Sequence, residues 1–191
     1  DVIITCGDTP LITAESYRRL VEERRRTSSS AVLATMVLDN PKSYGRIKRD
    51  SSGNVLGIVE YRDATREERM IREVNTGTYC FEGAALKDAI KKLTNQNAQG
   101  EYYLTDTIAN LLGSGRQVRA LVHHDPDEFL GINDPADSVV AEEKLGQRVK
   151  RRHLSGGVII EEPQMVRIEP AVKIGSRTRI RPGTILEGNT E

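Results

Sequence analysis

The sequence predicts an α/β domain that is followed by a long helix and by a tail with a different apolar period. Apolar runs at residues 2–6 and 31–38 flank an amphipathic segment at residues 14–26. A strand, a helix and a strand in this order are typical of a parallel crossover in an α/β fold. In the tail, apolar residues recur every six positions, at Ile168, Ile174, Ile180 and Leu186.

The first third of the chain contains two expected strands, one helix and one hairpin. Residues 2–6 and 31–38 are short, continuous apolar runs, which we expect to be strands buried on both faces. Thr13 stands where the N-cap of the helix at 14–26 belongs. Residues 43–49 and 55–60 flank a five-residue loop of turn-forming residues and read as a β-hairpin.

The rest of the chain contains further expected helices and strands. Asp63 is expected to cap a short helix that reaches about residue 72. Further elements are expected as strands at 73–81 and 118–123 and as helices at 84–93, 103–112 and 135–154. Pro135 suits the first turn of the last helix.

The tail has an apolar period of its own. A six-residue apolar period is typical of a parallel β-helix, in which each hexad forms one face of a coil. The alternative is an irregular tail of short strands that is rich in Gly and Pro. The domain boundaries that we expect are residues 1–134 for the α/β domain, 135–156 for the helix and 157–191 for the tail.

Composition and charge exclude several classes of protein. The 191 residues contain 28 Lys and Arg against 28 Asp and Glu, so the formal net charge is zero. This balance argues against a nucleic-acid binder and against a polybasic membrane binder. No apolar run approaches the ~20 residues that a membrane-spanning helix needs. Cys6 and Cys80 are expected to be buried, reduced thiols, which favours a cytoplasmic location.

Two candidate residues offer oxygen ligands for a metal ion. Asp8 follows the strand at residues 2–6, and ligands of open α/β sheets bind at the carboxyl ends of strands. A carboxylate there can hold Mg²⁺, which often takes only one or two protein ligands. Asn133, which precedes the helix at 135–154, offers a neutral amide oxygen. The alternatives are a turn-forming role for Asp8 and a helix N-cap at Asn133 or Asp134.

Three further candidates suit the binding of sugar hydroxyl groups. Gly45 allows a ligand to approach the backbone closely, and Glu60 at a strand end and Asn75 within a strand offer hydrogen-bonding side chains. The alternatives are an eased turn at Gly45, a solvated strand end at Glu60 and a β-bulge at Asn75. The polar loop at residues 95–106 is expected to anchor a helix, with a mobile lid as the alternative.

The sequence does not support other kinds of metal or catalytic site. His123 and His124 are adjacent in an expected strand and point to opposite faces, so we interpret them as structural. The sequence holds no Gly-rich phosphate loop followed by Lys and no Ser/His/Asp or Cys/His set for acyl hydrolysis.

Taken in order, the segments resemble one family over essentially the whole chain. The matching segments are Gly7–Leu11, Tyr44–Ile47, Ile58–Glu60, Asp63–Ala64, Glu73–Gly77, residues 95–106 and Gly131–Asn133. This set resembles the bacterial bifunctional N-acetylglucosamine-1-phosphate uridylyltransferase / glucosamine-1-phosphate N-acetyltransferase family. The hexad tail fits the same family, and the stretch at 95–106 is the most specific part of the match.

The resemblance implies a fold and a set of residue roles. The fold would be a Rossmann-like nucleotidyltransferase domain, joined by a linker helix to a left-handed parallel β-helix. Asp8 and Asn133 match magnesium ligands, and Gly45, Glu60, Asn75 and Asn133 match positions that bind the sugar nucleotide. No catalytic residue beyond the metal site is implied.

The implied reaction is attack by N-acetylglucosamine 1-phosphate on UTP, which gives UDP-N-acetylglucosamine and pyrophosphate. Acetyl-CoA and glucosamine 1-phosphate would be substrates of the acetyltransferase part, and the β-helix would form a homotrimer. Neither nucleic acid nor membrane is an expected partner.

The sequence departs from the family pattern in several places. It lacks the family's N-terminal Gly-rich loop and the later β-helix coils, and it does not begin with Met. We therefore expect it to be a fragment that is inactive alone. Arg62 stands where the family usually has Lys, and Pro135 where Arg is frequent. The rival hypotheses are a nucleotidylyltransferase for another sugar phosphate and a non-catalytic assembly module built on the hexapeptide repeats.

Overall fold

The computed structural model describes all 191 residues. They form two compact units, Asp1–Phe129 and Leu130–Glu191. No helix combines the length and the apolar character that crossing a bilayer requires.

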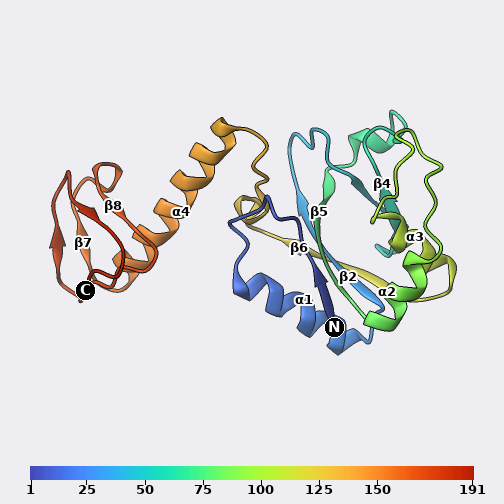
Figure 1. Cartoon of the computed structure of the whole chain (residues 1–191), viewed down its shortest axis with the longest axis horizontal. Coiled ribbons are helices and arrows are strands. Elements are labelled where there is room, and N and C mark those ends of the chain that lie inside the picture. The colour runs from blue at the N-terminus through green and yellow to red at the C-terminus, as the bar shows by residue number, and fades with distance from the viewer. The chain divides into compact units, whose positions relative to one another are not determined.

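A mixed six-stranded sheet forms the centre of the first unit (Figure 1). Its strands are β1 (Val2–Ile4), β2 (Ala31–Val37), β3 (Arg46–Arg49), β4 (Val55–Val59), β5 (Glu73–Phe81) and β6 (Val118–His123). The order is β4-β3-β5-β2-β6, and β1 pairs with β5. β2 and β6 are parallel, whereas the other pairs are antiparallel. The predicted α/β class and the predicted hairpin are confirmed.

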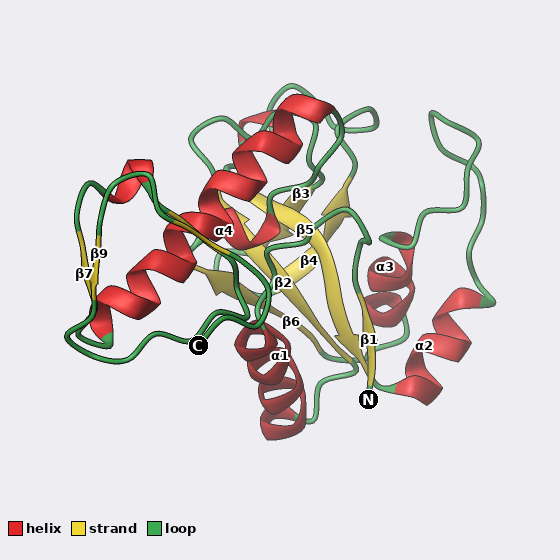
Figure 2. Cartoon of the chain, turned by 60° about the vertical axis from the view of Figure 1, so that its left-hand side comes forward, coloured by secondary structure: helices red, strands yellow, loops and turns green.

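Three helices cover the two faces of this sheet (Figure 2). They are α1 (Ala14–Thr27), α2 (Gly83–Ile90) and α3 (Asp106–Gly113). The predicted N-cap is confirmed, since the Thr13 side chain accepts a hydrogen bond from the backbone N–H of Ser16. α2 and α3 are shorter than predicted at 84–93 and 103–112, because turns occupy residues 91–92 and 104–105.

Alternation along β2 divides the core of the first unit into two clusters. Ala31 and Leu33 pack with residues of α2 and α3, whereas Val32, Ala34 and Met36 pack with residues that include Leu20 of α1. Successive side chains of a strand point to opposite faces, so one buried strand supplies both clusters. Figures 1 and 2 show α1 on one side of the sheet and α2 and α3 on the other.

Two predictions about the start of the chain are wrong. β1 is not buried on both faces: Val2 and Ile3 are 38% and 41% exposed, because this three-residue strand pairs only with β5. Cys6 lies beyond the end of β1 and is exposed, whereas Cys80 in β5 is buried as predicted.

Asp63 does not begin a helix either. Only one short 3₁₀ turn, at Glu68–Met70, forms in the predicted range. The Asp63 carboxylate instead accepts a hydrogen bond from the backbone N–H of Ala98, at 2.9 Å. A distant loop therefore uses the side chain that local sequence assigned to a cap, and this contact ties the loop at residues 95–106 to the rest of the unit.

A long helix, α4 (Pro135–Ser155), opens the second unit. Its N-cap is Asp134, whose side chain accepts a hydrogen bond from the backbone N–H of Asp137 at 2.9 Å. Pro135 lies in the first turn as predicted, where its missing N–H leaves no donor unsatisfied.

Short strands follow α4 and pair in parallel. They are β7 (Ile159–Ile160), β8 (Arg167–Ile168), β9 (Arg179–Ile180) and β10 (Ile185–Leu186). β7 pairs with β9, and β8 pairs with β10. The residues of the six-residue period all join one apolar cluster with Val149 of α4. The period therefore marks the side chains that turn inward.

Candidate functional site

The register of three strands brings Gly45, Glu60 and Asn75 together. Arg46 at the start of β3 lies opposite Val59 of β4 and opposite Val74 of β5. Both pairings are antiparallel, so the residue before Arg46 lies opposite the residues that follow Val59 and Val74. The backbone carbonyl of Gly45 accepts a hydrogen bond from the N–H of Asn75 at 2.9 Å. Three of the residues predicted from sequence thus share one place in the sheet.

Gly45 lies against the Glu60 carboxylate. A Cβ atom at Gly45 would lie 3.3 and 3.4 Å from the two carboxylate oxygens and 3.1 Å from a methyl carbon of Ile58. Any side chain here would crowd the carboxylate, so the glycine does more than ease a turn. The N–H of Gly45 is buried and forms no hydrogen bond within the chain. Buried N–H groups are nearly always paired, so this N–H is a donor that the rest of the chain leaves unused.

Glu60 is half-buried and fixed by a hydrogen bond. The hydroxyl of Thr105 donates to Oε1 of Glu60 at 2.9 Å, and Thr105 itself is buried. Glu60 is therefore more than a solvated strand end, because its carboxylate is partly buried and held by Thr105. Thr105 was not singled out from the sequence, because only the folded loop brings it to a residue 45 positions earlier.

Asn75 is buried, and part of its amide is already engaged. Its Nδ2 donates to the hydroxyl of Tyr79 at 2.7 Å, and its Oδ1 accepts from the N–H of Gly77 at 3.3 Å. The pairing of β5 with β2 is irregular between Asn75 and Tyr79, so the predicted bulge is also present. One N–H and one lone pair of the amide remain for a ligand. Burial raises the pKa of Tyr79 and keeps this phenol neutral.

Gly77 permits the bulge. Its φ of +76° lies in the left-handed region, and a Cβ there would lie 2.6 Å from Sγ of Cys6. Burial, and then the charge of Asp8, raise the pKa of the Cys6 thiol. The thiol is therefore not an activated nucleophile.

A small cleft of about 160 Å³ opens beside Glu60. Its lining consists of Ser43, Glu60, Tyr61, Arg62, Gln99 and Tyr103. The hydroxyl of Tyr103 is buried there without a hydrogen-bond partner. Arg62, at one of the positions that depart from the family pattern, therefore faces the cleft. An unpaired hydroxyl, a carboxylate and a guanidinium give this cleft the polar groups that a sugar phosphate requires.

The carboxylate of Asp8 has no structural partner. The residue is exposed, and its carboxylate forms no hydrogen bond or ion pair. The turn after β1 is closed by Thr9, whose hydroxyl donates to the carbonyl of Cys6 at 3.0 Å. Asp8 lies in this turn, but its carboxylate does not bond the backbone of the turn, as the alternative would require. A free carboxylate suits Mg²⁺, a hard cation that prefers oxygen ligands.

Asn133 belongs to the second unit and is exposed. The N-cap of α4 is Asp134, so the capping alternative for the Asn133 side chain is not realised. Its backbone N–H donates to Oδ2 of Asp137 at 3.0 Å, and the side-chain amide forms no hydrogen bond. Its oxygen is a neutral ligand of the kind that Mg²⁺ accepts.

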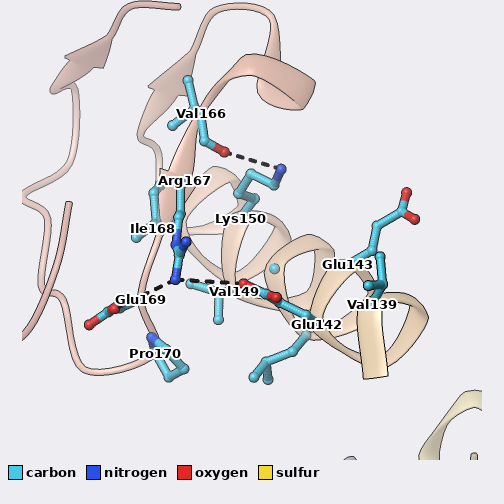
Figure 3. Close-up of a pocket in the computed structure, with 12 residues that line it drawn as sticks. Val139, Glu142, Glu143, Val149, Lys150, Val166, Arg167, Ile168, Glu169 and Pro170 are labelled. Atoms are coloured by element: carbon cyan, nitrogen blue, oxygen red, sulfur yellow. Dashed lines mark hydrogen bonds and ion pairs between the residues drawn. The ribbon is translucent and has the colours of Figure 1, made fainter. Parts of the chain in front are cut away.

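Other parts of the molecule offer no comparable chemistry. No three His, Cys, Asp or Glu side chains come together as a metal site. His123 is buried and packs edge-on against Phe129 at 4.8 Å, and burial lowers its pKa, which fits the structural role predicted for it. In the second unit, a mostly apolar groove between α4 and β8 is bordered by the ion pair of Arg167 with Glu142 (Figure 3). None of the predicted site residues lines this groove.

The chain is similar to known proteins over most of its length. The family model described as nucleotidyl transferase matches residues 1–148. Curated relatives named bifunctional protein GlmU are 45% identical in Geobacillus sp. (strain WCH70), over 98% of this chain, and 42% identical in Bacillus subtilis (strain 168), over 99% of it. The resemblance found in the sequence is thereby confirmed. The chain spans 41% of the length of these relatives.

A solved structure shares the fold. The chain matches a putative glucose-1-phosphate thymidylyltransferase from Bacillus anthracis, solved in complex with a sucrose, with a TM-score of 0.52 and 20% identity. The match covers 73% of this chain and 53% of that one.

Proposed function

Because the chain belongs to the nucleotidyl transferase family, we propose that it carries the sugar-nucleotide site of an enzyme that transfers a nucleotidyl group to a sugar phosphate. The donor would be UTP and the acceptor N-acetylglucosamine 1-phosphate. The products would be UDP-N-acetylglucosamine and pyrophosphate. The family match and the relatives named bifunctional protein GlmU support this class of reaction.

The observation that carries the proposal is the meeting of Gly45, Glu60 and Asn75 in one register of the sheet. The unpaired N–H of Gly45 would donate to an oxygen of the sugar. The Glu60 carboxylate, held by Thr105, would accept from a sugar hydroxyl or amide, and the free N–H of Asn75 would donate to another oxygen. These residues bind and orient the sugar, and none of them needs to form a covalent intermediate.

The chemistry is the attack of one anion on another. A phosphate oxygen of the sugar 1-phosphate would form a bond to the α-phosphorus of UTP, and the bond to pyrophosphate would break. The barrier falls when the two groups are held in line and their charge is neutralised. Asp8 would hold Mg²⁺, which supplies that neutralisation when bound. Arg62, in the cleft beside Glu60, would add a fixed positive charge.

Asn133 would contribute to the site through its side-chain amide. The resemblance assigns it both to magnesium and to the sugar nucleotide, and its free side-chain amide supports either role. An Asn133→Ala variant would then reduce the affinity for Mg²⁺ or for the sugar nucleotide without lowering thermal stability, since Asp134 caps α4.

For the second unit we propose the role of a linker helix, α4, and the start of a left-handed β-helix. The parallel pairing of β7 with β9 and of β8 with β10, together with the inward-facing hexad residues, supports this assignment. In the complete protein, further coils would carry acetyl transfer from acetyl-CoA to glucosamine 1-phosphate and would assemble a homotrimer. The two unpaired cysteines agree with a cytoplasmic location, where thiols stay reduced.

The test compares the two activities of the complete natural protein. Asp8→Asn is expected to lower uridylyl transfer about 100-fold or more, since it removes the charge that holds the metal. Acetyl transfer should remain within about twofold of the wild type, because Asp8 would act in the first reaction only. Equal loss of both activities would indicate misfolding, and full retention of uridylyl transfer would refute the role of Asp8.

The rival functions predict other outcomes. An enzyme for another sugar phosphate would keep the effect of Asp8→Asn but would prefer a different acceptor in a substrate profile. A non-catalytic assembly module, which the parallel pairs of the tail favour, would form a trimer but would not bind UDP-N-acetylglucosamine.

A further inference from the structure

Arg46 is a buried cation that has no acidic partner. It is 2% exposed, although it follows Gly45 directly and begins β3. Its guanidinium forms no ion pair and instead donates to backbone carbonyls. Burial lowers the pKa of this group; Tyr61 opposes that effect and the nearby Arg69 adds to it. Burying a charge is costly unless hydrogen bonds compensate, so the placement of Arg46 calls for an explanation.

Four carbonyl groups surround the guanidinium. Nη1 donates to the carbonyls of Tyr44 and, at 3.4 Å, Pro41, and Nη2 donates to that of Lys42 at 2.9 Å. Nε donates to the carbonyl of Arg69 at 3.4 Å. Three of the four acceptors belong to the segment that leads into Gly45. The planar fork of an arginine can satisfy several acceptors at once, which a lysine ammonium cannot reproduce in the same geometry.

The segment that Arg46 holds is in a strained conformation. Lys42 has φ +42°, in the left-handed region that residues other than glycine rarely occupy. Such a conformation is strained and persists only when its surroundings hold it in place. The hydrogen bond from Arg46 to the Lys42 carbonyl provides part of that support.

The same hydrogen bonds fix the direction of the Gly45 N–H. All peptide bonds are trans, so the carbonyl of Tyr44 and the N–H of Gly45, which share one peptide plane, point in opposite directions. Since Arg46 holds that carbonyl, it also aims the N–H away from itself. This N–H is the buried, unpaired donor beside Glu60.

Arg46 also acts on the cleft beside Glu60. Its guanidinium lies 5.6 Å from the ring centroid of Tyr61, and the guanidinium of Arg69 lies 4.6 Å from the same ring. Tyr61 and Ser43 both line the cleft, and Ser43 lies between Lys42 and Tyr44, whose carbonyls both accept from Arg46. One side chain thereby fixes two walls of the cleft, because cations over an aromatic face attract it.

We propose that Arg46 is a positioning residue, which presents the Gly45 N–H and the Ser43 and Tyr61 walls of the cleft to the sugar phosphate. The inference rests on the proposed function, since it assigns the sugar phosphate to this cleft. Arg46 itself does not touch the ligand, because its donors are used by the backbone carbonyls.

The test combines two measurements on the complete natural protein. Variants Arg46→Lys and Arg46→Met are compared with Arg66→Met, which alters an exposed arginine in the segment that also carries Tyr61 and Arg69. Hydrogen exchange is followed at the amides of residues 42–45, and Michaelis constants are measured for both substrates.

In Arg46→Met we expect faster exchange at residues 42–45 and a KM for the sugar phosphate raised about tenfold, with the KM for UTP within about twofold. Arg46→Lys should fall between Arg46→Met and the wild type, and Arg66→Met should match the wild type. A merely structural role would lower the active fraction, and hence kcat, without separating the two KM values.

Two results would overturn the proposal. Unchanged exchange at residues 42–45 would show that Arg46 does not hold the segment, and equal changes in both KM values would show that the segment does not serve the sugar phosphate. Failure of the proposed function is distinguishable, since the wild type would then turn over no sugar phosphate while the exchange experiment still decides the anchoring role. If Arg46→Met does not fold, Arg46→Lys carries both measurements.

Discussion

The two units of the chain build their cores in different ways. In the first unit, β2 separates two apolar clusters whose members come from segments as distant as Leu20 and Phe129. In the second unit, one cluster gathers residues between Val149 and Leu186, and the hexad positions lie among them. Strand pairing between distant segments thus determines which residues form the core of the first unit. In the second unit, a local six-residue period does so. The candidate sugar site depends on register, and its residues are correspondingly far apart in sequence.

The largest expected effect comes from the strand that both clusters of the first unit share. Leu33→Ala removes a side chain that is 0% exposed, and should lower the free energy of unfolding of the first unit by about 3–4 kcal/mol. The control is Val37→Ala, at the end of the same strand, where the side chain is 52% exposed and about 0.5 kcal/mol or less is expected. Urea denaturation of both variants measures the difference. Similar losses in the two variants would contradict a core centred on β2.

A smaller loss is expected at a hexad position of the second unit. Ile180→Ala should lower the stability of this unit by about 2–3 kcal/mol, because Ile180 is 8% exposed and belongs to its apolar cluster. Ile185→Ala is the matched control, since Ile185 lies off the period and is 62% exposed. The thermal unfolding of the second unit, Leu130–Glu191, is measured for both variants. Equal destabilisation would show that the six-residue period does not determine which side chains face inward.

The smallest effect concerns a charge in the first unit. Burial alone would raise the pKa of Glu73, but hydrogen bonds from Arg49 and Thr35 outweigh it and hold this pKa below its usual range. A carboxyl whose pKa is lower in the folded chain stabilises the fold above the unfolded pKa, and this contribution is lost as the pH falls through the folded value.

Wild-type stability should therefore contain a component that disappears below about pH 4.5, worth about 1 kcal/mol for a partly screened pair. Glu73→Gln should lack that component and show a shallower loss of stability with acid. Denaturation midpoints between about pH 3 and pH 7 provide the measurement. If the stability of the wild type and of Glu73→Gln fell equally with acid, this role of Glu73 would be contradicted.

Much of the architecture could be predicted from local patterns. The cap at Thr13, the hairpin of β3 and β4, the start of α4 and the inward hexad residues all depend on neighbouring residues. The errors arose where tertiary contacts override local signals. Asp63 has the chemistry of a cap, yet its carboxylate binds the backbone of residue 98.

The candidate site shows the same division. Gly45, Glu60 and Asn75 could be singled out as residues, but only the pairing of β3 with both β4 and β5 places them together. Local sequence does not point to Thr105 or to Arg46. The hydroxyl of Thr105 lies 45 positions from its acceptor, and an arginine in a strand is not unusual by itself.

The measurement that tests the central claim most directly is a calorimetric titration of the complete natural protein with UDP-N-acetylglucosamine. Wild type, Glu60→Gln and the control Glu67→Gln, an exposed carboxylate outside the site, are compared. We expect the control to bind like the wild type and Glu60→Gln to bind about tenfold or more weakly, since it loses a charged acceptor. Undiminished affinity in Glu60→Gln would contradict the sugar-nucleotide site described here.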